Sequence, residues 1–200
     1  MATSSFRYRM RVEGELSGSA VYEVLVERTI GPRLAGETPG GSIVLGEALL
    51  LSAPAAVFVL LRSAVEGRDL MGAIMHALAP DVSLSEEPFS WAVAKHLSGT
   101  RNREAVGELP RGHWPLMVRF RDLADSTSVE QVEPEEIGVR RILVQVTNDA
   151  VSRGIERRLA WLKSEGRTLD PASGPTFSDN PPLAQIIKQN DFKSGNWELR

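Results

Sequence analysis

The chain has 200 residues, of which 42% are hydrophobic and 24% charged, and this composition is ordinary for one globular domain. It contains no cysteine, which excludes disulfides, thiolate nucleophiles, zinc fingers and iron–sulfur clusters. The net charge is −3 and neither half is strongly basic, so a dedicated nucleic-acid-binding protein is not expected. The arginines near the start precede no apolar run, so we expect no secretory signal and a cytoplasmic location.

The first element predicted along the chain is a strand hairpin. Apolar and charged residues alternate strictly from residue 6 to residue 13, which is typical of a strand with one buried face. The expected buried face holds Phe6, Tyr8, Met10 and Val12. A turn at Ser17–Ser19 leads into a second strand with Tyr22, Val24 and Val26 in phase, so residues 1–41 are expected to form an antiparallel hairpin and a loop.

The most apolar run of the chain is Ala48–Leu61. It is shorter than the roughly 20 residues that cross a bilayer. We interpret it as a buried helix that begins near Ser52 or Ala53, with Pro54 in its first turn. A membrane-inserting hairpin is the alternative. Residues 42–51 are compatible with either a strand or a helix, because short apolar runs do not reveal their period.

Two further helices are expected before residue 112. One covers residues 68–78, where Leu70, Ile74 and Leu78 share a face and Pro80 ends the pattern. The other follows a capping pattern at Ser83 and Glu86 and has an apolar face of Phe89, Val93 and Leu97. Residues 42–112 are therefore predicted to be mainly helical.

Strands return beyond Trp114, and residues 113–166 are predicted to be a strand–loop–strand–helix unit. The strands are Leu116–Arg121 and a second strand with Ile142, Val144 and Val146 inward. The helix is expected at Val151–Glu165, with Val151, Ile155, Leu159 and Leu162 on its apolar face. Residues 167–200 are expected to be a loop-rich tail with a short helix near residues 179–189. The whole chain is thus predicted to be one α+β domain, in which the N-terminal hairpin and the C-terminal strands form an antiparallel sheet and the last long helix packs on it.

The acidic stretch after the strand Leu116–Arg121 is the main place to look for catalysis. Asp122 and Asp125 follow the strand, and His113 precedes it, so a metal-independent hydrolase using these three residues is one hypothesis. The competing interpretation is structural, because Asp and Ser side chains bond nearby backbone N–H groups and shape turns. The sequence has no Walker, dinucleotide-binding, G-x-S-x-G or H-E-x-x-H motif, so no cofactor or metal is expected.

The preferred functional hypothesis is a non-enzymatic protein-interaction or accessory module, of which a toxin-neutralising protein is one form. Charged residues in and after the acidic stretch form the candidate interaction surface: Arg119, Arg121, Glu130, Glu133, Arg140, Arg153 and Arg157. The expected partner is another protein. The alternatives are the hydrolase and a peripheral membrane association through residues 48–61.

The segment from Leu109 to Pro134 resembles part of a group of small bacterial proteins for which no activity is established. The shared pattern is close to L-P-x-L-V-x-F-x-D-x-x-D-P-x-S-V-x-x-V-x-P, then G-I-x-x-x-L-x-W-L, then D-F. It corresponds here to Leu116, Val118, Phe120, Asp122, Asp125, Ser128, Val129, Val132, Pro134, Gly154, Ile155, Leu159, Trp161, Leu162, Asp191 and Phe192. This chain departs from it at Ser126, where the pattern has proline, and in its long middle segment. The resemblance implies a bacterial origin and a strand–loop–strand–helix unit, and it supplies no mechanism.

Overall fold

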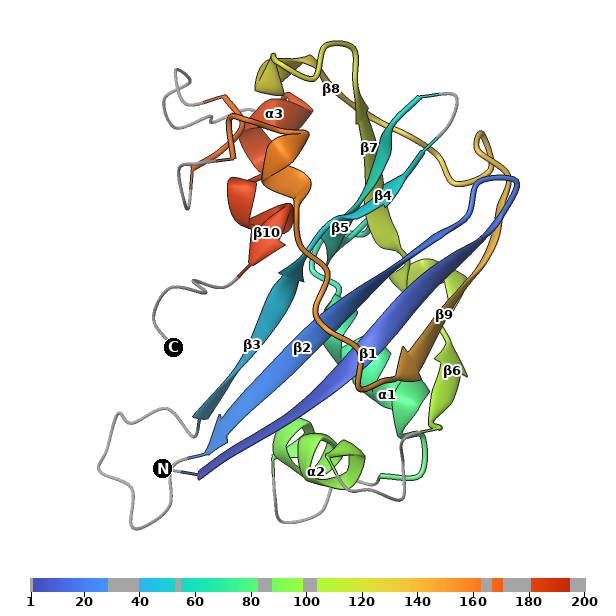
Figure 1. Ribbon diagram of the computed structural model, residues 1–200, viewed down its shortest axis with the longest axis vertical. Coiled ribbons are helices and arrows are strands. Elements are labelled where there is room, and N and C mark those ends of the chain that lie inside the picture. The colour runs from blue at the N-terminus through green and yellow to red at the C-terminus, as the bar shows by residue number, and fades with distance from the viewer. Residues whose placement is uncertain are drawn as a thin grey trace.

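The computed structural model describes residues 2–28, 40–52, 55–82, 88–98, 104–162, 167–170 and 181–194, which build two antiparallel sheets (Figure 1). The larger sheet has the order β10-β3-β2-β1-β9-β6 and the smaller has the order β4-β5-β7-β8. The strands are β1 (Ala2–Gly14), β2 (Gly18–Arg28), β3 (Gly40–Glu47), β4 (Leu49–Leu51), β5 (Val57–Ser63), β6 (Val106–Glu108), β7 (Pro115–Phe120), β8 (Val129–Gln131), β9 (Val139–Val146) and β10 (Lys193–Ser194). The helices are α1 (Leu70–Leu78), α2 (Phe89–Leu97) and α3 (Leu183–Ile186). Short 3₁₀ turns are η2 (Arg111–His113), η3 (Ser126–Ser128), η4 (Ile155–Arg157) and η5 (Gln189–Asp191). The predicted α+β class, with helices packed on antiparallel sheets, is confirmed.

The hairpin of β1 and β2 lies at the centre of the larger sheet, as the alternating pattern predicts. The two strands pair with Tyr8 opposite Tyr22, and the two buried rings stack 5.1 Å apart. On its other side β1 pairs with β9, which brings Ile142, Val144 and Val146 into the same core. One face of the larger sheet is therefore a continuous apolar surface.

The first residues of β5, in the smaller sheet, are buried on both faces. Val57 and Val59 of β5 join the core of the larger sheet, whereas Phe58 and Leu60 point into a second core formed with the C-terminal segments. Strands covered on both sides are apolar at every position and lose the alternation that identifies a strand. The helix predicted within Ala48–Leu61 is therefore wrong, and the chain forms β4 and β5 there.

The same burial contradicts the membrane-inserting hairpin, because β4 and β5 contact protein on both faces. Among the described residues, no helix is long and apolar enough to cross a membrane. The expected helix start at Ala53 and Pro54 lies outside the described residues. Residues 42–51, which the sequence left open, form the end of β3 and the whole of β4.

Helix α1 agrees with its prediction. Its first turn is capped by Asp69, whose Oδ1 accepts a hydrogen bond from the Met71 N–H at 3.0 Å. The helix ends before Pro80, and its buried side chains include Leu70, Ile74 and Leu78.

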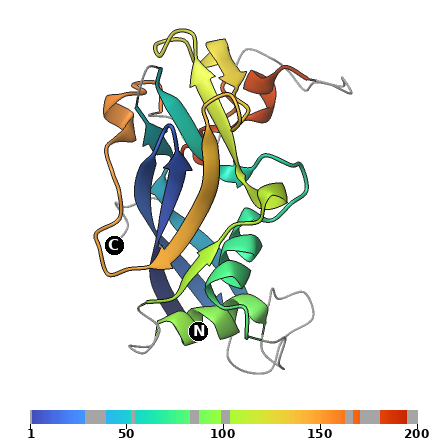
Figure 2. The same cartoon turned by 90° about the vertical axis from the view of Figure 1, so that its right-hand side faces the viewer.

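Helix α2 packs beside α1 and buries Val93 and Leu97 as expected. The predicted capping residues Ser83 and Glu86 lie outside the described ranges. The two helices lie together at one end of the larger sheet, while the C-terminal elements lie at the other (Figure 2). Because β3, β4, β5 and β6 also fall between residues 40 and 108, the prediction that residues 42–112 are mainly helical is wrong.

The C-terminal part also differs from its prediction. The described portion of Val151–Glu165 contains only the 3₁₀ turn η4 and irregular chain. Its apolar side chains Ile155, Leu159 and Leu162 are nevertheless buried against the smaller sheet. Val151, the fourth residue of the predicted apolar face, is only partly buried. The spacing thus identified three of the four side chains correctly, and an irregular segment rather than a helix places them. The short helix expected in the tail is present as α3.

Candidate functional site: an arginine-lined cleft

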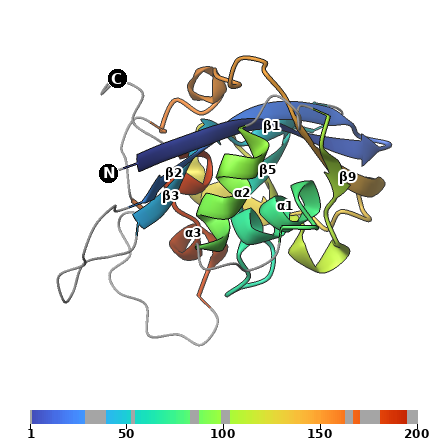
Figure 3. The same cartoon turned by 90° about the horizontal axis from the view of Figure 1, so that it is seen from below.

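The segment 147–154, which we name the crossing segment, carries the chain from β9 across β1 and β2. It starts with a hydrogen bond from the Thr147 N–H to the Arg7 carbonyl at 3.0 Å. Arg9, on the charged face of β1, forms an ion pair with Asp149. Figure 3 shows this segment on one side of β1, with α1 and α2 on the other. The alternating arginines of β1 therefore help to hold the crossing segment.

Ser152 attaches the crossing segment to the edge of β2. Its N–H donates to the Val21 carbonyl at 3.0 Å, and its Oγ accepts from the Val21 N–H at 2.9 Å. This edge is open to Ser152 because β3 pairs with β2 only from Glu23 onward.

After Ser152 the chain turns sharply at Gly154, which has φ = +117°, a conformation that glycine adopts without the strain of a side chain. The turn brings Ile155 into the second core and its N–H within 2.8 Å of Glu47 Oε2. Glu47 is only 6% exposed. One carboxylate oxygen of this buried acid is therefore used to hold the turn.

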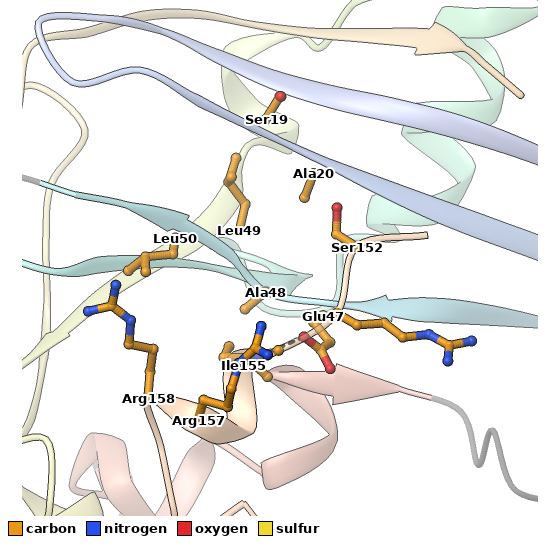
Figure 4. Close-up of a pocket in the computed structure, with 12 residues that line it drawn as sticks. Ser19, Ala20, Glu47, Ala48, Leu49, Leu50, Ser152, Ile155, Arg157 and Arg158 are labelled. Carbon is orange, nitrogen blue, oxygen red and sulfur yellow. Dashed lines mark hydrogen bonds between the residues drawn. The ribbon is translucent and has the colours of Figure 1, made fainter. Parts of the chain in front are cut away.

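A cleft of about 360 Å³ lies between the turn, the first residues of β2 and the junction of β3 with β4. Its charged lining residues are Glu47, Arg153, Arg157 and Arg158, and Ser19 and Ser152 add hydroxyl groups. Figure 4 shows Arg157 and Arg158 rising from one side, with Ser19 and Leu49 on the other. We name this the arginine cleft.

The side chains of Arg157 and Arg158 are available for a ligand. Both residues are exposed, and within the described ranges neither guanidinium forms an ion pair or a hydrogen bond. The described residues that line the cleft include one acid and three arginines, which gives this lining a net positive charge. Its chemistry suits a carboxylate or a phosphate group.

The loop after β7 has the turn-forming hydrogen bonds that the structural interpretation predicts. Asp125 Oδ1 accepts from the Thr127 hydroxyl at 2.7 Å and from the Thr127 N–H at 2.9 Å. These hydrogen bonds, that of the hydroxyl first, lower the pKa of Asp125 below its ordinary value. Asp122 Oδ1 accepts from the Ala124 N–H at 2.9 Å, and the buried Ser128 hydroxyl donates to the carbonyls of Asp122 and Asp125.

The structure does not bring His113 together with Asp122 and Asp125. His113 ends the turn before β7 and the two acids follow β7, so they lie at opposite ends of this strand. Six residues of strand span roughly 20 Å. His113 instead lines a separate cavity of about 540 Å³ with Asp69, His76 and other residues, and its buried Nδ1 has no hydrogen-bond partner in the described structure.

The charged residues predicted as an interaction surface fall into separate places. Arg119 and Arg121 both pair with Glu130, at 3.2 and 3.1 Å. Glu133 accepts a hydrogen bond from Gln131, and Arg140 is exposed on β9. Arg153 and Arg157 line the arginine cleft.

The sequence did not indicate that four other residues line the cleft, namely Ser19, Glu47, Ser152 and Arg158. The run from Arg153 to Arg158 was the only signal, since three arginines stand within six residues there. Its meaning depended on β2 and β4, which are far away in the sequence.

No family model, no curated protein and no solved structure matches the chain. The resemblance to the bacterial group therefore stays a prediction, and no relative supplies a function.

Proposed function

We propose that the protein is a non-enzymatic binding module whose arginine cleft receives an acidic group of a partner protein. The observation that carries the proposal is the pair Arg157 and Arg158, two neighbouring guanidinium groups at the edge of a cleft for which the described residues provide no partner. Glu47, the only acid among the described residues that line the cleft, has an oxygen bonded to the Ile155 N–H.

Arginine suits this task because its planar guanidinium can donate two parallel hydrogen bonds to one carboxylate or phosphate. Both arginines are exposed, so a single pair with a ligand is worth only about 0–1 kcal/mol. Useful affinity then requires several contacts at once. The cleft offers two arginines, the Ser19 hydroxyl and an apolar wall that includes Leu49 and Leu50.

The other charged candidates give less support. Arg119 and Arg121 are already paired with Glu130, so an acidic ligand would have to compete with that carboxylate. The hydrolase alternative requires His113 and Asp125 in one site, and they lie at opposite ends of β7. An accessory or toxin-neutralising protein would use the cleft to bind its partner protein non-covalently.

Affinity capture with matched variants tests the proposal. The immobilised chain, the double variant Arg157→Gln/Arg158→Gln and the control Lys95→Gln, at an exposed cation on α2, are exposed to a lysate of the source organism at low and high salt. We expect the parent and the control to retain a protein at low salt that the double variant does not retain. High salt should release this protein from the parent, because salt screens exposed charges. Identical retention by all three chains would contradict the proposal.

A further inference from the structure

One position on the edge of β2 offers backbone hydrogen bonds to the arginine cleft. In an antiparallel pair, every second residue of a strand directs its N–H and C=O away from the neighbouring strand. Val21 directs both groups away from β1, because they bond Ser152. Ser19, two residues earlier, must direct its N–H and C=O to the same side.

Within the part of the chain that the structure describes, no strand lies beside β2 at Ser19. The pairing of β2 with β3 begins at Glu23, and Ser152 is hydrogen-bonded to the backbone N–H and C=O of Val21. At Gly18, β4 lies close, because a Cβ on Gly18 would come within 3.3 Å of the Leu50 carbonyl oxygen. Ser19 itself is exposed and lines the cleft. It is therefore an edge position between two covered ones.

We propose that the ligand of the arginine cleft is the extended carboxyl-terminal end of a peptide chain. Its backbone pairs with the N–H and C=O of Ser19, and its terminal carboxylate lies against Arg157 and Arg158. An apolar side chain of the ligand contacts the wall at Leu50. This inference rests on the proposed function and names the chemistry of the partner.

Two features of the cleft favour a chain end over an isolated anion. A free strand edge recognises the alternating donors and acceptors of a peptide backbone, which phosphate or acetate lacks. The charge complementarity also requires a carboxylate a short distance along the same chain. In Figure 4, Ser19 lies on the side opposite Arg157 and Arg158, and all three residues line the same cleft.

Isothermal titration calorimetry with three defined peptides tests this. The probes are N-acetyl-Ala-Leu-Leu with a free carboxylate, its carboxyl-terminal amide, and N-acetyl-Ala-Glu-Leu amide, which carries its acid on a side chain. We expect the free acid to bind, and both amides to bind at least about tenfold more weakly. Arg157→Gln/Arg158→Gln should weaken the binding of the free acid by a similar factor. The control Lys95→Gln, which removes an exposed cation on α2 outside the cleft, should not.

The contact with Ser19 has its own test. Ser19→Pro removes the proposed donor, and proline is tolerated at strand edges, so the variant should still melt cooperatively but bind the free acid more weakly. Should this variant fail to fold, N-methylation of the probe peptide at one backbone amide at a time replaces it. At least one methylated peptide should lose affinity for the parent chain.

The outcomes separate the inference from the proposed function. Equal binding of the free acid and the side-chain acid overturns the chain-end ligand but leaves an acidic ligand in place. Full affinity for every methylated peptide overturns the pairing with Ser19. If the free acid does not bind at all, the inference is wrong, and the capture experiment alone decides the proposed function.

Discussion

Replacing Glu47 tests how the turn at Ile155 is held. Glu47 is 6% exposed and accepts the Ile155 N–H at 2.8 Å. Glu47→Ala leaves this buried amide without an acceptor, which should lower the free energy of unfolding by about 1–3 kcal/mol. For a chain of this length, each kcal/mol corresponds to a change in Tm of roughly 2–4 °C. Glu47→Gln keeps an acceptor oxygen at the same place and should cost less than Glu47→Ala.

Urea melts followed by tryptophan fluorescence give these differences directly. The matched control is Glu136→Ala, an exposed acid whose loss should change the free energy of unfolding by less than about 0.5 kcal/mol. In the helix that the sequence predicts, the Ile155 N–H would donate to the Val151 carbonyl, and Glu47 would accept no hydrogen bond from it. Equal stability of Glu47→Ala and Glu136→Ala would therefore contradict the irregular turn and support the predicted helix.

Three other predictions concern the core and the acidic loop. Leu159 is fully buried, so Leu159→Ala should lower the free energy of unfolding by about 2–5 kcal/mol in urea melts. Arg157 is exposed, so Arg157→Ala should lower it by less than about 0.5 kcal/mol. Equal losses would show that the burial is misassigned. The buried Tyr22 hydroxyl has no hydrogen-bond partner in the described structure, so Tyr22→Phe should leave the free energy of unfolding unchanged or raise it by up to about 2 kcal/mol, and a clear loss of stability would reveal a missing partner. The pKa of Asp125 is lowered in the folded state by its bonds to Thr127, so its contribution to stability is present above an unfolded pKa of about 3.9 and is lost as the pH falls through the folded pKa. The gap in stability between the parent and Asp125→Asn should thus close as the pH falls, and a gap that is constant in acid would contradict this.

The elements with one buried face could be predicted from the sequence. In β1 the apolar residues from Phe6 to Val12 alternate with charged ones, because one face of the strand meets the core and the other meets solvent and the crossing segment. Helix α1 was predicted for the corresponding reason, since its apolar residues recur at helical spacing on a single face.

The elements that were predicted wrongly have no such one-sided pattern. Strand β5 is buried on both faces, so Val57–Leu60 is apolar at every position and carries no strand period. The segment after Ser152 has the spacing of a helix at Ile155, Leu159 and Leu162, but its chain direction is decided by Gly154 and by Glu47. A contact with a residue so far away in the sequence leaves no local signal.

The arginine cleft could be predicted only in part. Arg153 and Arg157 were expected at a charged interaction surface, and the structure places both at the cleft. The free edge at Ser19 follows from where β3 stops pairing with β2, which is a property of the assembled sheet.

The binding of an acidic group in the arginine cleft can be measured most directly by NMR of the arginine side chains. The Nε–Hε signals are assigned in a ¹⁵N-labelled chain and followed during titration with N-acetyl-Ala-Leu-Leu free acid. The account predicts saturable shifts at Arg157 and Arg158, with the paired Arg119 and Arg121 unchanged. Shifts confined to Arg119 and Arg121, or no shift at any arginine, would contradict it.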